Sequence, residues 1–316
     1  MAAGINHVII VVAMEQEVRP IVERFALQKL PDGTFLAGAP FVAWAGNVSG
    51  LTLHVVWLGR DPRFGNVNNV ATTAAAVATY AAVSVFGVPH LLISAGTAGG
   101  FARAGASVGD VFISSKCVFH SRRIPSLDGE LEEYGFGHYR SPPLGALARK
   151  LGVKVGVIST SDSLDTVPTD LELMSSEGAA VKEMEAAAVA WTCQALAVPF
   201  IAVKSITDIV DGPHATRDEF ESNLHVASTQ LQQKLAGLLQ CVAGTPLSHW
   251  ALSSATPSAS YSGTTVSAQT TEAGSEAMRA CATASDVQHS NGIKGVMLGA
   301  VLATAFMLAY RSQGAR

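Results

Sequence analysis

Charge is scarce in this 316-residue sequence, and it contains no long run of one sign. Charged residues make up only 15% of the chain, and its 21 basic and 25 acidic residues give a formal net charge of −4. A surface that binds nucleic acid needs clustered basic residues, so this balance argues against nucleic acid as a partner. It favours a small neutral or cationic ligand instead.

The sequence also lacks paired cysteines and metal-ligand spacings. Its four cysteines, Cys117, Cys193, Cys241 and Cys281, are widely separated and form no C-x-x-C pair, which is typical of reduced thiols in an intracellular protein. No metal-ligand spacing appears, so we expect no metal site. The first apolar run, residues 7–13, has no basic leader and no small-residue cleavage site, so we interpret it as a buried strand rather than a signal peptide.

Up to about residue 243, β-branched apolar runs alternate with alanine-rich segments of helical period, which is the pattern of an α/β protein. The chain is 48% hydrophobic and long enough to bury a sizeable core. We expect strands that are buried on both faces and covered by helices, with active-site groups at the strand ends. The expected strands are residues 8–12, 53–58, 91–94, 111–118, 154–158 and 200–203, and the expected helices are residues 66–85, 184–196 and 217–242.

The composition changes after Cys241. Residues 248–290 are dominated by Ser, Ala and Thr without any period, which predicts a disordered linker. Residues 295–310 carry no charge. As a helix they would span only about 24 Å, and this segment is shorter than the roughly 20 residues that usually cross a bilayer. Two interpretations remain open: a C-terminal membrane anchor, which we favour, and a helix that docks on the main domain or on a partner.

Three acidic residues lie at the ends of predicted strands or helices. Glu17 comes directly after the first strand, Glu185 precedes an alanine-rich helix, and Asp208 ends a buried strand. Acids are common in first helical turns because they complement the helix dipole, so Glu17 alone carries little weight, and we assign this ordinary role to Glu183. Burial would raise the pKa of Asp208, which suits a group that must hand a proton to a leaving group.

Two further features bear on the same region. Met184 and Glu185 could place a thioether and a carboxylate against one sugar, because a carboxylate can accept two hydroxyls. Lys204 could orient Asp208, and a solvated lysine is the alternative.

A glycine-rich segment, residues 94–100, follows the strand at 91–94, and its glycines would let the backbone pass close to a ligand. The strand has no Arg or Lys, which a free-phosphate site would want, so it favours water over phosphate as the nucleophile. Arg60 and Arg63 leave a phosphate site open as an alternative.

Seven segments, taken in order, resemble the nucleoside phosphorylase and nucleosidase superfamily, and most closely the plant-type 5′-methylthioadenosine nucleosidases. They are AMEQEV (13–18), LGRD (58–61), SAGTAGGF (94–101), GDVFISSKCVFHSRRIP (109–125), STSDSLD (159–165), KEMEAAAVA (182–190) and KSITDIVDG (204–212). The resemblance covers residues 5 to about 243. It implies a three-layer α/β fold with a central mixed sheet flanked by helices. Together with the change in composition after Cys241, it divides the chain into a catalytic domain (5–243), a disordered linker (244–292) and a candidate anchor helix (293–312).

The resemblance also implies an activity: hydrolysis of 5′-methylthioadenosine to adenine and the thioribose, in methionine salvage, by a cytoplasmic homodimer without a cofactor. Glu17 matches the glutamate that positions and deprotonates the attacking water, and Asp208 matches the aspartate that protonates purine N7. Met184 and Glu185 match the ribose-binding pair. The full set expected to contact substrate is Thr97, Ala98, Gly99, Leu164, Lys182, Met184, Glu185 and Lys204, of which Thr97 lies near the ribose and the water, and Leu164, Lys182 and Lys204 lie near the purine.

The sequence departs from its relatives at three places. Residues 120–122 read His-Ser-Arg where relatives have His-Asp-Arg, residues 160–162 read Thr-Ser-Asp where they have Thr-Gly-Asp, and residues 127–140, near the expected subunit interface and 5′-substituent pocket, are divergent. We interpret His120 as structural. S-adenosylhomocysteine as an additional substrate, a phosphate-dependent phosphorylase and a non-catalytic nucleoside-binding or storage protein all remain open alternatives.

Overall fold

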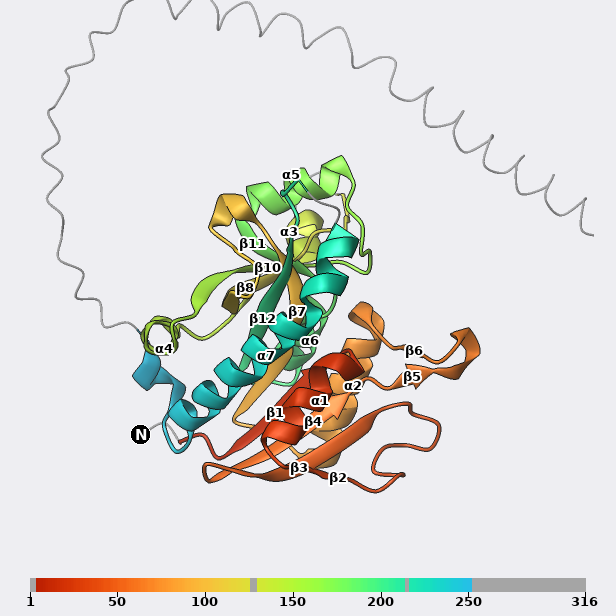
Figure 1. Ribbon diagram of the computed structural model, residues 1–316, viewed down its shortest axis with the longest axis vertical. Helices are drawn as coiled ribbons and strands as arrows, with labels where there is room; N and C mark the ends of the chain where they lie inside the picture. The colour runs from red at the N-terminus through yellow and green to blue at the C-terminus, as the bar shows by residue number, and fades with distance from the viewer. Residues whose placement is uncertain (1–3, 126–129, 214–215, 252–316) are drawn as a thin grey trace, which may run out of the picture. The chain divides into compact units, whose positions relative to one another are not determined.

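A computed structural model describes residues 4–125, 130–213 and 216–251. A ten-stranded sheet runs through it in the order β11-β10-β8-β12-β7-β1-β4-β3-β2, with β9 paired to β8 (Figure 1). Its strands are β1 (His7–Val12), β2 (Gln28–Lys29), β3 (Val42–Val48), β4 (Leu51–Trp57), β7 (Leu91–Gly100), β8 (Val111–Phe119), β9 (Tyr139–Arg140), β10 (Lys154–Thr160), β11 (Ala179–Glu183) and β12 (Phe200–Ile209). A separate pair, β5 (Arg60–Asp61) and β6 (Val67–Asn68), lies in the loop after β4.

The sheet is mixed, and part of it closes on itself. β1 pairs in parallel with β4 and β7, whereas β12 pairs in parallel with β7 and antiparallel with β8. β11 pairs with β10 and also, through Val181 and Lys182, with the end of β7. The strands β7, β12, β8, β10 and β11 therefore form a ring, and their ends meet around one point.

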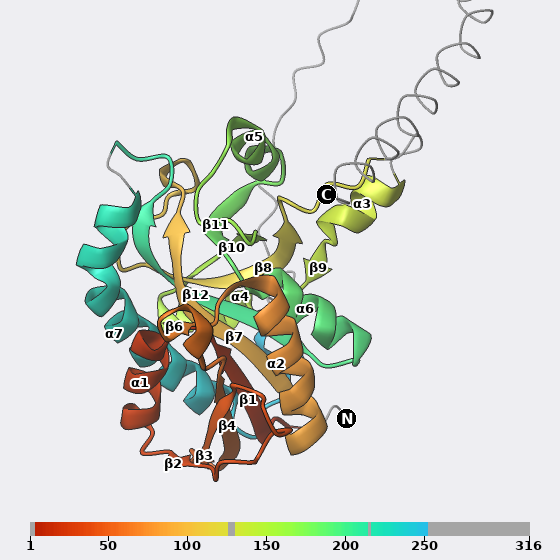
Figure 2. The same ribbon diagram turned by 90° about the vertical axis from the view of Figure 1, so that its right-hand side faces the viewer.

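Helices cover both faces of the sheet, as Figure 2 shows. They are α1 (Glu15–Arg24), α2 (Ala71–Phe86), α3 (Glu130–Phe136), α4 (Gly145–Leu151), α5 (Pro168–Ser176), α6 (Ala186–Ala195) and α7 (Thr216–Val242). One core cluster lies between the sheet and α2 with α6, and a second lies between the sheet and α1, α4 and α7. The predicted three-layer α/β architecture is confirmed.

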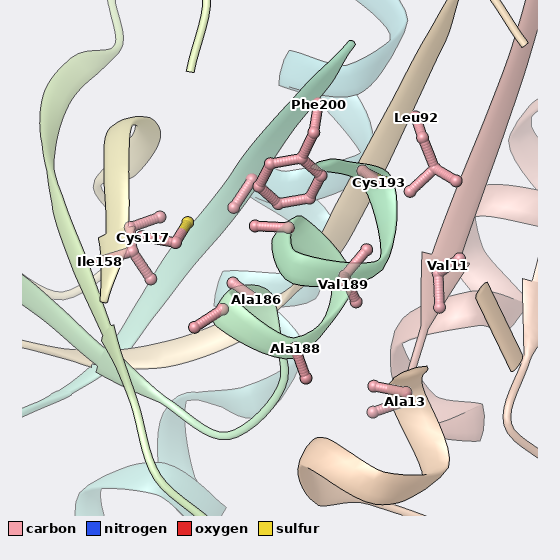
Figure 3. Packing of buried hydrophobic residues seen from close by; sticks show 14 of the residues in the cluster. Val11, Ala13, Leu92, Cys117, Ile158, Ala186, Ala188, Val189, Cys193 and Phe200 are labelled. Atoms are coloured by element: carbon pink, nitrogen blue, oxygen red, sulfur yellow. The ribbon is translucent and has the colours of Figure 1, made fainter. Parts of the chain in front are cut away.

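The core beneath α6 is built from small side chains. Ala186, Ala188 and Val189 of α6 are buried, and so is Cys193 at its last turn (Figure 3). Phe200 at the start of β12 lies in the same cluster. Small residues let the helix approach the sheet closely, which brings the residues before its first turn to the strand ends.

Two strands extend beyond their predicted ends. The strands expected at 91–94 and 200–203 continue as β7 to Gly100 and as β12 to Ile209. Each continuation is the ladder partner of the other, with Thr97 opposite Ser205 and Gly99 opposite Asp208. The extension depends on this pairing and not on the apolar character of either segment. The helix expected from residue 66 begins at Ala71, because β6 occupies the first part of that segment.

The described chain also continues past the expected domain end at residue 243. A short 3-10 helix, Leu247–Trp250, follows α7, and Trp250 is buried in the core cluster beside α4 and α7. Within the part of the chain that the structure describes, no helix combines the length and apolar character needed to cross a membrane. The predicted anchor at 293–312 and most of the predicted linker lie outside those residues.

Burial of Trp250 predicts that the segment after α7 stabilises the domain. We expect Trp250→Ala to lower the free energy of unfolding by about 3 kcal/mol, the usual cost of truncating a buried aromatic side chain. The exposed Ser248 in the same turn is the control, and Ser248→Ala should leave stability within about 0.5 kcal/mol of wild type. Denaturant unfolding measures both, and equal stabilities of the two variants would contradict the packing described.

Candidate active site

The carboxylate of Glu17 is buried at the strand-to-helix junction after β1. It is 3% exposed and accepts the backbone N–H of Thr97 at 2.6 Å, the hydroxyl of Thr97 at 2.7 Å and the N–H of Met14 at 3.1 Å. Gly96 leaves the necessary space, since a Cβ there would lie 3.2 Å from Glu17 Oε1. Burial raises the pKa of Glu17, and the bonds from Thr97 oppose that rise. The group is suited to accept a proton.

A buried ion pair lies beside it. Lys204, in the middle of β12, places its Nζ 2.8 Å from Glu183 Oε2 at the end of β11. Burial alone would raise the pKa of Glu183, but the charge and hydrogen bond of Lys204 hold it below its usual range. Burial likewise disfavours the charged form of Lys204, yet Glu183 and Glu185 raise the pKa of its ammonium group. Both partners are therefore charged at neutral pH.

Glu185 is the second acid near this ammonium group. Its Oε2 lies 4.0 Å from Lys204 Nζ, and its Oε1 accepts the backbone N–H of Ala71 at 2.9 Å. Burial raises the pKa of Glu185 to about 7; Lys204 opposes the rise and the negative charge of Glu183 adds to it. Met184, next in the chain, is half-buried. Glu185 thus has acceptor capacity left for hydroxyl donors.

Asp208 occupies the other side of the β7 end and has one free oxygen. Its Oδ1 accepts the hydroxyl of Thr207 at 2.7 Å, whereas its buried Oδ2 has no hydrogen-bond partner among the described residues. Burial raises the pKa of Asp208, with Thr207 and the charge of Lys182 opposing the rise. A Cβ on Gly99 would lie 2.8 Å from Oδ2, so this glycine makes room for the carboxylate. An unpaired, easily protonated oxygen is suited to give a proton to a ligand.

Lys182 connects Asp208 to the loop after β10. Its Nζ donates to the carbonyl oxygens of Ser163 at 3.2 Å and Leu164 at 2.6 Å. The Leu164 side chain is exposed, so its backbone is the part held in place. Thr97, Ala98 and Gly99 lie in the buried end of β7. The structure therefore gathers the residues predicted from the sequence around the ends of β7, β11 and β12.

Lys204 differs from its expected place. The alternative of a solvated lysine is wrong, because the residue is 1% exposed. Its carboxylate partner is Glu183, while the lysine that acts on Asp208 is Lys182. His120 is 2% exposed, with Nδ1 2.9 Å from Ser159 Oγ, and its structural role stays an interpretation.

Sequence reasoning missed the importance of Glu183. Its expected role at a helix start is present, since it accepts the N–H of Ala186 at 2.9 and 3.0 Å. The ion pair with Lys204 was not expected. The available signal was Lys204 itself, because a lysine inside a strand buried on both faces requires a buried acid.

The relationship to known proteins agrees with this geometry. A model of the phosphorylase superfamily matches residues 7–240. The chain belongs to this superfamily. It is 37% identical over 244 residues to 5′-methylthioadenosine/S-adenosylhomocysteine nucleosidase of Arabidopsis thaliana, covering 77% of this chain and 94% of that one. A 5′-methylthioadenosine nucleosidase of the same plant is also 37% identical over 244 residues, with 77% and 90% covered.

Solved structures give the same result for the fold. The apo structure of Arabidopsis thaliana 5′-methylthioadenosine nucleosidase matches with a TM-score of 0.75 at 36% identity, covering 78% of this chain and 99% of that one. A nucleosidase from Colwellia psychrerythraea, solved in complex with adenine, matches with a TM-score of 0.60 at 25% identity and with 77% and 98% covered. The resemblance inferred from the seven sequence segments is confirmed.

Because the chain belongs to a phosphorylase superfamily, we asked whether its site could bind phosphate. Arg60 and Arg63, the cations that could have bound phosphate, are each paired with a carboxylate. Arg60 donates to Glu15 in a short contact, and Arg63 Nη2 donates to Asp61 at 2.6 Å. The glycine-rich segment directs the N–H of Thr97 to the Glu17 carboxylate, which would repel a bound anion. Both observations disfavour phosphate at this site.

Within residues 4–125, 130–213 and 216–251, no group of three or more His, Cys, Asp or Glu side chains is placed to hold a metal ion.

The position of Lys182 generates a prediction about Asp208. We expect Lys182→Met to raise the pKa of Asp208 by about one unit, because the change removes a nearby positive charge that favours the carboxylate. Carboxyl 13C chemical shifts followed against pH measure this, with Asp208→Asn assigning the signal. Lys116→Met is the matched control, since Lys116 is paired with Glu177 instead. An Asp208 pKa that is the same in Lys182→Met and wild type would refute the contact.

Proposed function

We propose that this chain hydrolyses the N-glycosidic bond of 5′-methylthioadenosine, releasing adenine and the thioribose in methionine salvage. One observation carries the proposal: the site combines a buried carboxylate held by Thr97 with a second buried carboxylate, Asp208, that has a free oxygen. The first is placed to act as a base and the second as an acid. The names of the Arabidopsis relatives support the same substrate class.

The proposed mechanism is dissociative. Asp208, whose pKa is raised by burial, protonates N7 of the purine while the bond between C1′ and N9 lengthens. The ribosyl group becomes cation-like, as in O-glycoside cleavage, and a water captures it. Glu17, whose pKa is also raised, accepts the proton of that water. Each proton transfer is typically worth about 10²–10⁴-fold in rate.

The other side chains bind and orient the nucleoside in this proposal. Glu185 accepts the ribose hydroxyls, and Met184 packs against the sugar. Thr97 lies between the ribose and the water through its contact with Glu17, and Ala98 and Gly99 provide a close backbone surface. The loop carbonyl of Leu164, fixed by Lys182, faces the adenine.

A non-catalytic nucleoside-binding or storage role is the weaker candidate. Binding alone would not require Asp208 to keep a buried oxygen unpaired, because such an atom costs folding free energy. S-adenosylhomocysteine remains a candidate second substrate, since one Arabidopsis relative is named for both nucleosides and the other for one.

The activity is tested by incubating the full chain with 5′-methylthioadenosine, S-adenosylhomocysteine, adenosine and inosine, each with and without phosphate. We expect adenine release from 5′-methylthioadenosine at the same rate in both conditions. A phosphate-dependent rate with a ribose 1-phosphate product would establish a phosphorylase, and no base release from any nucleoside would refute the proposed hydrolysis.

Asp208→Asn should lower kcat by about 10²–10⁴-fold while substrate affinity falls much less, because the amide retains the shape but cannot protonate the purine. Gly99→Ala should also lower kcat, since its methyl group would lie 2.8 Å from Asp208 Oδ2 and 2.7 Å from Val210 Cγ2 and would displace the carboxylate. Gly237→Ala, where the methyl group meets only the flexible end of Leu151, is the control. Steady-state kinetics measure all three, and a near wild-type kcat in Asp208→Asn would remove Asp208 from the mechanism.

Assembly and location complete the proposal. We propose a homodimer through the adjacent helices α2 and α6, which expose Val77, Tyr80 and Trp191 at 55%, 60% and 45%. The mass of the protein in solution tests it, and a monomer at micromolar concentration would contradict it.

We also propose a cytoplasmic catalytic domain with residues 293–312 as a membrane anchor. Equal solubility of the full chain and of a truncation before Lys294 would refute the anchor.

A further inference from the structure

Glu183 has more hydrogen-bond donors than a residue that only begins a helix needs. It accepts the N–H of Glu185 at 2.9 Å, the N–H of Ala186 through both oxygens, and the hydroxyl of Thr160 in a short contact. With Lys204 as a further donor, its carboxylate is held in one position. The position is set by β10, β11, β12 and the first turn of α6 together.

This fixed carboxylate decides where the ammonium group of Lys204 lies. Nζ is 2.8 Å from Glu183 but 4.0 Å from Glu185, which is beyond hydrogen-bond distance. Glu185 consequently has no direct bond to a cation, and its contact with Ala71 uses only one of its oxygens. The carboxylate that must accept ribose hydroxyls is thus kept available.

We propose that Glu183 is a positioning residue that holds Lys204 away from Glu185, so that the ribose-binding carboxylate stays free of a competing ion pair. This inference rests on the proposed function. Without the charge of Glu183, the ammonium group would move to the nearest remaining carboxylate and form a direct bond with Glu185. The nucleoside would then have to break that bond in order to bind.

The other charged and titratable groups around Glu183 come from four elements. Cys117 of β8 and His120, just after it, feel the charge of Glu183, but burial keeps the thiol protonated and lowers the pKa of the histidine to about 4, so both are neutral near pH 7. Lys182, next to it in β11, is held by loop carbonyls. Glu17 of α1 and Glu185 before α6 are the two acids that compete for Lys204.

We expect substitution of Glu183 and substitution of Lys204 to shift the acid limb of the pH dependence of kcat/KM in opposite directions. Glu183→Gln removes a negative charge that raises the pKa of Glu185, so the acid limb should move down by about one pH unit, and KM should rise about tenfold. Lys204→Gln removes a positive charge that lowers the same pKa, so its acid limb should move up. These two shifts would follow from the charges alone even if Lys204 stayed in place, so the rise in KM is the sign that Lys204 has moved onto Glu185. The double variant Glu183→Gln/Lys204→Gln has no ammonium group to compete for Glu185, and its KM should return towards that of wild type; a KM that stays raised about tenfold there would overturn the inference.

Steady-state kinetics of adenine release between pH 5 and 9 — a range of about four units around the pKa values at issue — provide the measurement. Glu177→Gln is the matched control, because Glu177 is also a partly buried acid with a cationic partner, Lys116, but the charges that act on it are those of Lys116 and His138 and not those of this cluster. Its acid limb should coincide with that of wild type. Acid limbs of Glu183→Gln and Lys204→Gln that shift together, or both stay in place, would overturn the inference.

A double variant in which both members of the pair are neutral keeps the inference testable if Glu183→Gln alone does not fold. The double variant Glu183→Gln/Lys204→Gln leaves no unpaired buried charge, and its acid limb should lie below that of Lys204→Gln. Coincidence of those two limbs would overturn the inference as well. Failure of this inference can be told apart from failure of the proposed function. Absence of adenine release from the wild-type chain would refute the proposed function itself.

Discussion

The ammonium group of Lys204 is buried between the carboxylates of Glu183 and Glu185, and the rest of the site depends on this charge. Taking an ion out of water costs several kcal/mol even after relaxation, so such a cluster persists only where fixed donors surround it. Ala186 in the first turn of α6 and Thr160 supply those donors for Glu183, and Ala71 supplies one for Glu185. The close packing of the alanine-rich α6 against the sheet is therefore also an electrostatic requirement.

The two proposed proton-transfer groups are separated by the strand β7. Its register with β12 places Gly99 opposite Asp208, whereas Thr97, two residues earlier, donates to Glu17. Gly96 and Gly99 leave room for one carboxylate each. These glycines were expected to let the backbone pass close to a ligand, but their direct effect in the structure is to make room for acids.

Much of the fold was predictable because it depends on local patterns. The period of the apolar residues in α7 and the β-branched run in β1 each predicted their element within a residue or two. The ends of β7 and β12 were not predictable locally, because Thr97 and Ser205 are in strands only through each other. The same limit applies to the site: Asp208 was notable on its own, whereas the partner of Lys204 depends on how β11 and β12 are placed in the ring.

The central claim is that one nucleoside lies between Asp208 and Glu17, with its ribose on Glu185. A crystal structure of the Asp208→Asn variant with 5′-methylthioadenosine tests this most directly. The account predicts purine N7 within hydrogen-bond distance of residue 208, a water between Glu17 and C1′, and both ribose hydroxyls donating to Glu185. A nucleoside bound elsewhere, or one whose C1′ faces a bound anion in place of that water, would contradict it.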